Sequence, residues 1–309
     1  MPFDALLHFA PIYQTRVWGG RRLETVLGRV LPDDQPYGES WDLVDREKEQ
    51  SVVSSGRYAG ITLHELWTAH RAEIFGAASA AATSPRFPLL IKILDCVDDL
   101  SIQVHPPAAV APSLGGEPKT EMWYVAHADP GARIYAGLRA GVTREDFERG
   151  LADGSVAARV HSLDAHTGDS LFVPSGRLHA LGAGLLIYEI QQSSDTTYRV
   201  FDWNRLGLDG RPRDLHVAQS LACIDFDDVE PSLSHGAGLL AASPFFRVSR
   251  VRTGHMAPAG HCRLIMPIET TTWAGERLPP GQLTLCPASF TPPGPSGEWL
   301  EIEIGAALT

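Results

Sequence analysis

One stretch of the sequence restricts the fold more than any other part of the chain. Residues 168–179 read Gly-Asp-Ser-Leu-Phe-Val-Pro-Ser-Gly-Arg-Leu-His and fit the pattern G-x5-P-x-G-x2-H at every fixed position. That pattern is typical of a strand, a tight turn at Pro174 and Gly176, and a second strand that aims His179 into a small β-barrel. The sequence therefore predicts a barrel with a ligand-type residue on its inner wall.

Glycine and proline are frequent and scattered along the rest of the chain. The sequence holds 29 Gly and 23 Pro among its 309 residues, and short β-branched runs lie between them. This texture favours an all-β barrel or sandwich over a doubly wound α/β fold. We expect strands at residues 89–94, 101–104, 120–126, 170–173 and 185–200.

Three helices are expected between the strands. Thr62 and Glu65 form a capping box before a helix that ends at Gly76. Thr143 opens a second helix over 144–151 in the same manner, and Asp214 can cap a short third helix that ends at 222. These helices are too few to change the fold class, so we expect them as insertions in a β structure.

The segment 231–243, with Ser, Gly and Ala, predicts a domain boundary. Residues 1–235 are expected to form the metal-binding, catalytic domain with its helical insertions. Residues 236–309 show strand and turn texture, and we expect them to form a smaller C-terminal β domain that covers the barrel.

The charge and the cysteine usage argue against several classes of protein. The formal net charge is −11 at pH 7, so nucleic acid and anionic membranes are poor partners. The four cysteines lack metal or redox spacing and suit a reducing compartment. The first residues lack the cationic flank and long apolar run of a signal peptide. We expect a cytoplasmic protein that binds a small molecule, and the sequence leaves its oligomeric state open.

Further ligand-type residues precede the histidine motif. Side chains alternate between the faces of a strand, so Gln103 and His105 point the same way. The barrel can bring His105, Glu121 and His179 together, with Gln103 close enough to be a fourth ligand. Two imidazoles and a carboxylate form a catalytic-type zinc set, and redox iron remains possible with the same ligands.

A second cluster of polar residues lies further along the chain. In an extended strand, Asp195, Thr197 and Arg199 share one face, which is costly unless they bind something. Arg199 can clamp an oxyanion or phosphate, and Asp195 can fix its geometry. Lys119 lies two residues before Glu121, where a divalent cation and an arginine would lower its pKa. It is therefore a candidate proton carrier at neutral pH.

Seven segments follow one another in a recognisable order: 16–20 (RVWGG), 38–41 (GESW), 88–95 (PLLIKILD), 100–106 (LSIQVHP), 119–124 (KTEMWY), 173–180 (VPSGRLHA) and 191–199 (QQSSDTTYR). Together they resemble type I mannose-6-phosphate isomerase (phosphomannose isomerase) in its short form. The resemblance extends from residue 11 to about residue 225 and is weak after residue 235. As a set, the segments are specific.

The resemblance implies a cupin jelly-roll barrel: an all-β fold with a few inserted helices and a second, smaller C-terminal β domain. It implies a zinc ion held by the four candidate ligands, with Arg199 and Lys119 as catalytic residues. Asp195 and Arg199 are the expected substrate-binding residues. The implied reaction interconverts mannose 6-phosphate and fructose 6-phosphate by zinc-assisted proton transfer through an enediol. Arg16, Arg177 and Arg205 are candidate phosphate contacts, and Arg177 is expected to add a cation near the barrel mouth.

Two other functions stay open on the sequence. One is a sugar-phosphate-binding cupin without catalysis, and the other is an iron-dependent cupin dioxygenase. The presence of Lys119 and Arg199 argues against a mere sensor, and the neutral amide of Gln103 fits a dioxygenase poorly.

Overall fold

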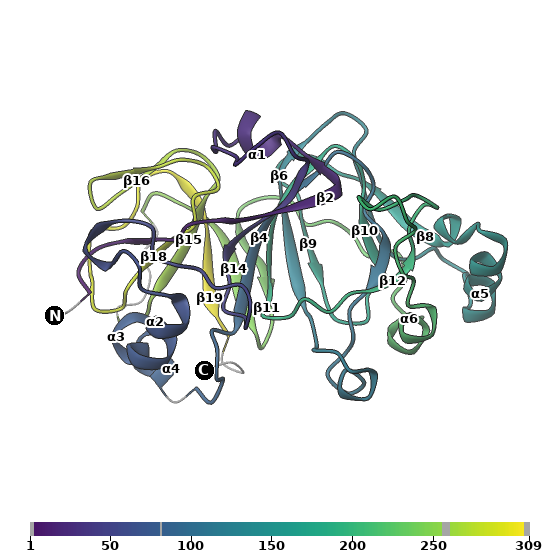
Figure 1. The fold of residues 1–309 in the computed structure, drawn as a ribbon, viewed down its shortest axis with the longest axis horizontal. Coiled ribbons are helices and arrows are strands. Elements are labelled where there is room, and N and C mark those ends of the chain that lie inside the picture. Colours follow the sequence, from purple (N-terminus) through teal and green to yellow (C-terminus); the bar gives the residue numbers. More distant parts are fainter. Residues whose placement is uncertain (1–2, 81, 255–259, 306–309) are drawn as a thin grey trace.

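The structure, a computed structural model, describes residues 3–80, 82–254 and 260–305. Within them, three antiparallel sheets follow one another along the long axis of the molecule (Figure 1). The prediction of an all-β fold with a few inserted helices is confirmed. The sheets are built as follows.

The middle sheet has the order β2 (Ile12–Gly20), β3 (Tyr37–Leu43), β4 (Leu89–Cys96), β11 (Leu185–Gln192), β6 (Glu121–Ala128), β9 (Ser170–Val173). A five-stranded sheet has the order β12 (Tyr198–Phe201), β5 (Ile102–Val104), β10 (His179–Leu181), β7 (Arg133–Leu138), β8 (Val160–Asp164). The third sheet has the order β1 (Leu7–His8), β18 (Thr284–Cys286), β15 (Arg263–Pro267), β19 (Glu298–Ile304), β14 (Phe246–Arg252), β13 (Gly238–Ala242). A separate pair joins β16 (Thr271–Trp273) and β17 (Glu276–Leu278).

The middle sheet is covered on both faces, which explains why β4 and β11 are buried along their whole length. Successive residues of β6 point to opposite sides. Met122 and Tyr124 pack in a core shared with the C-terminal sheet, whereas Trp123 and Val125 pack in a core shared with the five-stranded sheet. The jelly-roll interior therefore lies between the middle and five-stranded sheets.

The predicted strand over 185–200 is wrong as a single element. The chain leaves the middle sheet at the end of β11 and enters the five-stranded sheet at β12, so it must break its extended conformation between them. In the turn, the amide of Ser194 donates to the carbonyl of Gln192 (2.7 Å), and the amide of Thr196 donates to Ser194 Oγ (3.2 Å). The polar residues at this point form the hydrogen bonds of a loop that crosses from one sheet to the other, and they do not belong to a strand.

Two of the three predicted helix starts are confirmed. Thr62 Oγ1 accepts the amide of Glu65 (3.0 Å), although the helix divides at His70 into α2 (Leu63–Ala69) and α3 (Arg71–Phe75). Thr143 and Asp146 form a capping box at α5 (Arg144–Asp153). Short segments complete the helices: α1 (Arg22–Thr25), α4 (Ala77–Ala80), and the 3₁₀ turns η1 (Gly56–Tyr58), η2 (Pro112–Leu114), η3 (Val156–Arg159).

The predicted cap at Asp214 is wrong. The last helix, α6 (Val217–Cys223), has His216 at its N-cap position and no side-chain cap. Asp214 stands two residues earlier and instead accepts a hydrogen bond from Arg199 Nη1 at its carbonyl (2.9 Å). A side chain so far before the first turn does not reach the free amides of the helix.

The predicted C-terminal domain, 236–309, is described except for 255–259 and 306–309. Its sheet begins with β13 at Gly238 and takes its edge strand, β1, from the other end of the chain, with His8 paired to Thr284. The sheet packs on the middle sheet through a common apolar core. The domain boundary at residue 235 stays a prediction. Figure 1 shows this sheet lying beside the middle sheet of the jelly roll.

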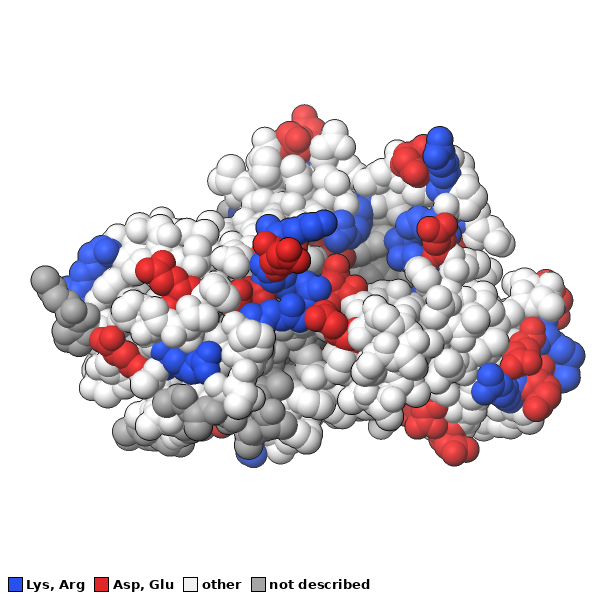
Figure 2. All heavy atoms as spheres, turned by 60° about the horizontal axis from the view of Figure 1, so that its bottom comes forward, with Lys and Arg blue, Asp and Glu red and all other residues white. Residues whose placement is uncertain are grey.

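In the described ranges, no helix has the length and apolar character needed to cross a membrane. The chain is acidic overall, but on the face shown in Figure 2 acidic and basic side chains lie interleaved. That face offers no broad basic surface of the kind that tracks a nucleic-acid backbone.

Candidate metal centre and substrate cavity

Three strands bring the predicted ligands together. His105 follows β5 directly, Glu121 is the first residue of β6, and His179 is the first residue of β10. Their ligand atoms all lie within 4.8 Å of one another, and the three residues are at most 1% exposed. The structure therefore converges two imidazoles and one carboxylate at a single point of the jelly-roll interior.

The backbone fixes the orientation of both imidazoles. His105 Nδ1 lies 2.9 Å from the carbonyl of Thr196, and His179 Nδ1 lies 2.8 Å from the carbonyl of Arg177. A carbonyl only accepts, so each Nδ1 carries the proton and each Nε2 presents a lone pair to the centre. Burial lowers the pKa of both histidines, that of His179 to about 3, and keeps the rings neutral. Neutral, oriented imidazoles are the form that binds a metal.

Glu121 is fully buried, and neither of its carboxylate oxygens accepts a well-directed hydrogen bond. Its Oε2 lies 3.3 Å from His105 Nε2, and its Oε1 lies 3.6 Å from His179 Nε2. Burial raises the pKa of Glu121, but the charge of Lys119 outweighs this and holds the pKa well below its ordinary value. A buried, ionised carboxylate of this kind calls for a cation beside it.

Lys119 supplies a cationic group at the centre. Its Nζ lies 2.7 Å from Glu121 Oε2 and donates to His105 Nε2 at 3.1 Å. Burial lowers the pKa of Lys119, but Glu121 and Glu189 more than reverse this, so the net pKa lies above its ordinary value. The side chains of the protein therefore raise the pKa of Lys119, whereas the sequence predicts that a divalent cation and an arginine lower it.

Gln103 lies at the edge of the same centre. Its Nε2 is 3.4 Å from His179 Nε2, and its Oε1 accepts a hydrogen bond from Ser101 Oγ (3.2 Å). The amide oxygen is the ligand atom of glutamine, so ligation requires the amide to turn over. Its role as a fourth ligand stays a prediction.

The donor set fits a divalent cation. Two inward lone pairs and a buried, ionised carboxylate match the ligands of a catalytic zinc site, which keeps a position free for water or substrate. The fold brings together three of the four predicted metal ligands, His105, Glu121 and His179, in one group.

A cavity of about 300 Å³ lies beside this centre. It is lined by Arg16, Trp18, Glu39, Lys92, Leu94, Leu100, Ser101, Gln103, Lys119, Glu189, Asp195, Thr197, Arg199 and Arg213. It therefore holds Lys119, Asp195 and Arg199, the predicted catalytic and substrate-binding residues. A separate cavity of about 260 Å³ beside Tyr13 contains none of them.

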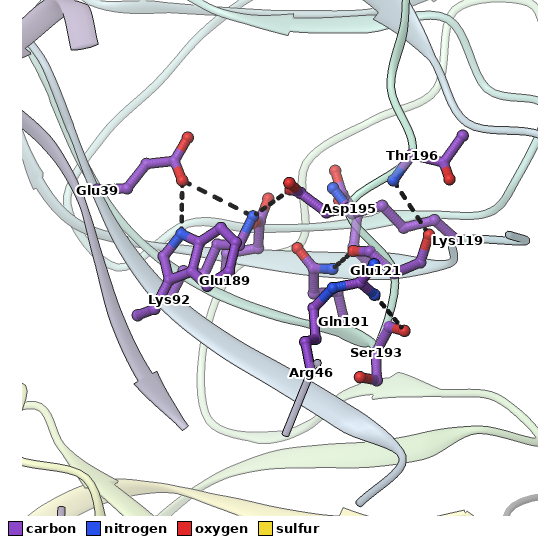
Figure 3. Close-up of polar contacts among 12 residues, drawn as sticks. Glu39, Arg46, Lys92, Lys119, Glu121, Glu189, Gln191, Ser193, Asp195 and Thr196 are labelled. Atoms are coloured by element: carbon purple, nitrogen blue, oxygen red, sulfur yellow. Dashed lines mark hydrogen bonds and ion pairs between the residues drawn. The ribbon is translucent and has the colours of Figure 1, made fainter. Parts of the chain in front are cut away.

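Lys92 is a buried charged residue of this cavity that sequence reasoning did not place in the site. Its Nζ lies 3.9 Å from Glu39, 3.9 Å from Glu189 and 3.5 Å from Asp195 (Figure 3). It also lies over the ring of Trp41, 4.8 Å from its centre. One ammonium group thus ties three acidic side chains into the cavity wall.

Glu39 and Glu189 were missed as well. Burial raises the pKa of Glu39, but Lys92 and Arg16 lower it to about 2, whereas burial and Glu121 raise the pKa of Glu189 to about 7. Glu189 accepts the indole N–H of Trp123 at 3.0 Å. The available signal was a Lys and a Glu inside otherwise apolar strands, since β4 reads LLIKILDC and β11 reads LLIYEIQQ.

The expected pairing of Asp195 with Arg199 is wrong. Asp195 lies in the crossing loop and pairs with Lys92, while Arg199 lies on β12 and donates to the carbonyl of Asp214. Both still line the cavity with Thr197. The loop bends the chain between them, so they share a cavity without contacting each other as strand neighbours.

The three candidate phosphate arginines are all held by carboxylates. Arg16 lines the cavity, but its Nε and Nη2 donate to Glu39 (3.0 and 3.1 Å). Arg177 binds Asp228 through Nε and Nη2 (2.8 and 2.7 Å) and is absent from the cavity lining, so the expected cation near the mouth is neutralised. Arg205 pairs with Asp202 and also stands outside the lining.

Several proteins that are similar to this chain are named mannose-6-phosphate isomerases. The model of the phosphomannose isomerase type I catalytic domain matches residues 6–115. The mannose-6-phosphate isomerase of Streptococcus mutans is 41% identical over 241 residues, which cover 75% of this chain and 74% of that protein. The crystal structure of the mannose 6-phosphate isomerase from Bacillus subtilis has a TM-score of 0.86 at 29% identity and covers 97% of this chain and 100% of that one.

A solved structure of a mannose 6-phosphate isomerase with zinc bound is more distant. It has a TM-score of 0.71 at 16% identity and covers 98% of this chain and 100% of that one. At this identity the likeness shows the fold, and the assignment of a metal to this chain depends on the chain's own residues.

Proposed function

Because the chain belongs to the mannose-6-phosphate isomerase family, we propose that it interconverts mannose 6-phosphate and fructose 6-phosphate. The observation that carries the proposal is the convergence of His105, Glu121 and His179 beside a polar cavity lined by Lys119 and Arg199. The donor set alone fits several metal enzymes, and the family membership selects among them.

We propose that His105, Glu121 and His179 hold a zinc ion, with Gln103 as the candidate fourth ligand. When bound, zinc supplies Lewis-acid stabilisation of negative charge on the sugar oxygens next to the carbonyl carbon. The carbonyls of Thr196 and Arg177 keep both imidazoles turned toward the ion.

Lys119 is the proposed proton carrier. It lies two residues before β6 and reaches both the cavity and the carboxylate of Glu121. Glu121 and Glu189 favour the protonated form of Lys119, which can donate a proton. To act as a base, Lys119 must be neutral, and this requires another cation that offsets part of the negative charge of the two glutamates.

Arg199 is the proposed substrate-binding and catalytic arginine, and Asp195 acts through a different partner than expected. Arg199 Nε is buried without an acceptor and is available to an anionic or polar substrate group. Asp195 holds the ammonium group of Lys92 at 3.5 Å and thereby shapes the cavity wall. A sugar phosphate has both the hydroxyl groups and the negative charge that such a wall recognises.

The isomerisation of mannose 6-phosphate by the purified protein, followed as fructose 6-phosphate formation, tests the proposal. We expect turnover that is lost with a chelator and restored by zinc. Binding of the sugar phosphate without turnover would instead support a non-catalytic cupin. Activity that depends on iron and molecular oxygen would support a dioxygenase. The cytoplasmic location and the absence of nucleic-acid and membrane partners stay predictions.

A further inference from the structure

Three guanidinium groups line the cavity, and among the described residues only that of Arg199 has no carboxylate partner. Arg199 lies on β12, and Arg213 lies in the segment between β12 and α6. In contrast to Arg16, whose fork is taken up by Glu39, Arg199 forms no ion pair within the described part of the chain. Its Nη1 donates to the carbonyl of Asp214, and its Nε is buried without an acceptor.

Arg213 is held in place by a buried carboxylate. Its Nε and Nη2 donate to the two oxygens of Asp202 (2.7 and 2.5 Å), and Asp202 is only 5% exposed. Arg205 donates to the same carboxylate from Nε and Nη2 (3.2 and 3.0 Å) and also pairs with Asp98. One carboxylate therefore fixes two arginines, but only Arg213 lines the cavity.

The local charge balance favours an anion. Burial and the neighbouring Arg213 lower the pKa of Arg199, and the carboxylate of Asp202 offsets this only in part. The acidic side chains of the cavity, Glu39, Glu189 and Asp195, lie around Lys92 instead. Two guanidinium groups of this kind repel each other until an anion with several acceptor oxygens lies between them.

Strand order gives the distance of this pair from the ligand cluster. Gln103 on β5 stands between His179 on β10 and Arg199 on β12 in the pairing register. Neighbouring strands lie about 4.8 Å apart, so the backbones of His179 and Arg199 are separated by about 10 Å. An open-chain six-carbon sugar spans such a distance between its carbonyl end and a phosphate on the last carbon.

We propose that Arg213, together with Arg199, binds the phosphate group of the substrate, and that Asp202 is the positioning residue that holds Arg213 at the cavity wall. The proposal rests on the proposed function, which supplies a phosphate ester as substrate. It assigns the phosphate to an arginine that the sequence did not single out, and it leaves Arg205 and Arg177 in structural ion pairs.

The test compares Arg213→Gln with its matched control Arg205→Gln, because both residues bind Asp202 and only one faces the cavity. Arg213→Gln is expected to raise KM for mannose 6-phosphate about 10-fold to 100-fold with kcat nearly unchanged. It should weaken competitive inhibition by inorganic phosphate by a similar factor. Arg205→Gln should change neither, and Arg213→Lys, which keeps the charge, should fall between wild type and Arg213→Gln.

A double-mutant cycle tests the positioning role of Asp202. Asp202→Asn should raise KM and weaken phosphate inhibition, and Asp202→Asn with Arg213→Gln should be no worse than Arg213→Gln alone. Simple addition of the two effects would overturn the positioning role. Equal KM and phosphate inhibition in wild type and Arg213→Gln, or equal losses in Arg205→Gln and Arg213→Gln, would overturn the phosphate assignment.

Calorimetric titration with inorganic phosphate separates this proposal from the proposed function, because it requires no turnover. Phosphate binding that is lost in Arg213→Gln and kept in Arg205→Gln supports the anion site even in a chain that does not isomerise mannose 6-phosphate. Isomerisation by wild type together with unchanged phosphate binding in Arg213→Gln would leave the proposed function standing and overturn this inference.

Discussion

The two faces of the middle sheet differ in the kind of side chain that they bury. The same strands, β4, β6 and β11, supply both faces by alternation. The face toward the C-terminal sheet is apolar and contributes Met122, Tyr124 and Tyr188 to a large core. The face toward the jelly-roll interior carries Lys92, Glu121 and Glu189 among apolar neighbours.

Neighbouring residues of one strand therefore have different roles: one contributes to stability and the next contributes to the site. Side chains on the covered face remove apolar surface from water, which is the main stabilising contribution to folding. Side chains on the interior face bury charge, which is unfavourable without partners or a ligand. The C-terminal sheet therefore serves the site indirectly, because it stabilises the strands that hold the charged residues in place.

The largest expected contrast lies between adjacent residues of β6. Glu121→Gln should reduce isomerase activity by at least about 100-fold, because the amide is a poor ligand for a divalent cation. Met122→Ala should lower the free energy of unfolding by about 2–5 kcal/mol and leave the activity of the folded protein in place. Denaturant unfolding and an isomerase assay measure the two effects. Full isomerase activity in Glu121→Gln would contradict the assignment of the interior face to function.

Lys119 and Lys48 give a second contrast among the chain's lysines. Lys119 is buried at the site, whereas Lys48 is exposed in the turn after β3. Lys119→Met should lower kcat roughly 100-fold if this ammonium group moves the proton. Lys48→Met should leave kcat unchanged. Steady-state kinetics decide, and an unaltered kcat in Lys119→Met would assign proton transfer to another group.

A smaller effect is expected at the next pair of β6. Trp123→Phe keeps an aromatic ring but removes the indole N–H that donates to Glu189, and it should lower kcat by up to about 10-fold. Tyr124→Phe, on the covered face, should leave kcat as it is. If both substitutions change kcat equally, the two faces are not functionally separate at this position.

The smallest effect is expected far from either face, at the start of α5. Thr143→Ala removes the hydroxyl that accepts the amide of Asp146 (3.2 Å) and should lower the free energy of unfolding by about 1 kcal/mol. Activity should not change. A loss of isomerase activity larger than the loss of folded protein would show that α5 affects the candidate metal centre.

The sequence was sufficient for the parts of the molecule that depend on local pattern. The Pro174 and Gly176 turn, the alternation around Gln103 and His105, and the capping threonines each depend on neighbouring residues, and the structure contains them as expected. The same locality explains why His105, Glu121 and His179 could be named in advance as candidate ligands.

Apart from the helix cap predicted at Asp214, the errors came from long-range pairing, which no local pattern encodes. The 185–200 segment alternates like one strand, but its two ends join different sheets. The partner of Asp195 is Lys92, which lies 103 positions away along the chain, and that of Arg177 is Asp228. The sequence did not single out Arg213, because its place at the cavity depends on its hydrogen bonds to Asp202, and the fold sets the position of Asp202.

Zinc content measured together with isomerase activity tests the central claim most directly. The account predicts one zinc per chain in active wild-type protein, and neither bound zinc nor activity in a variant that carries His105→Ala and His179→Ala. Full turnover by protein stripped of metal, or one zinc per chain retained in that double variant, would contradict it.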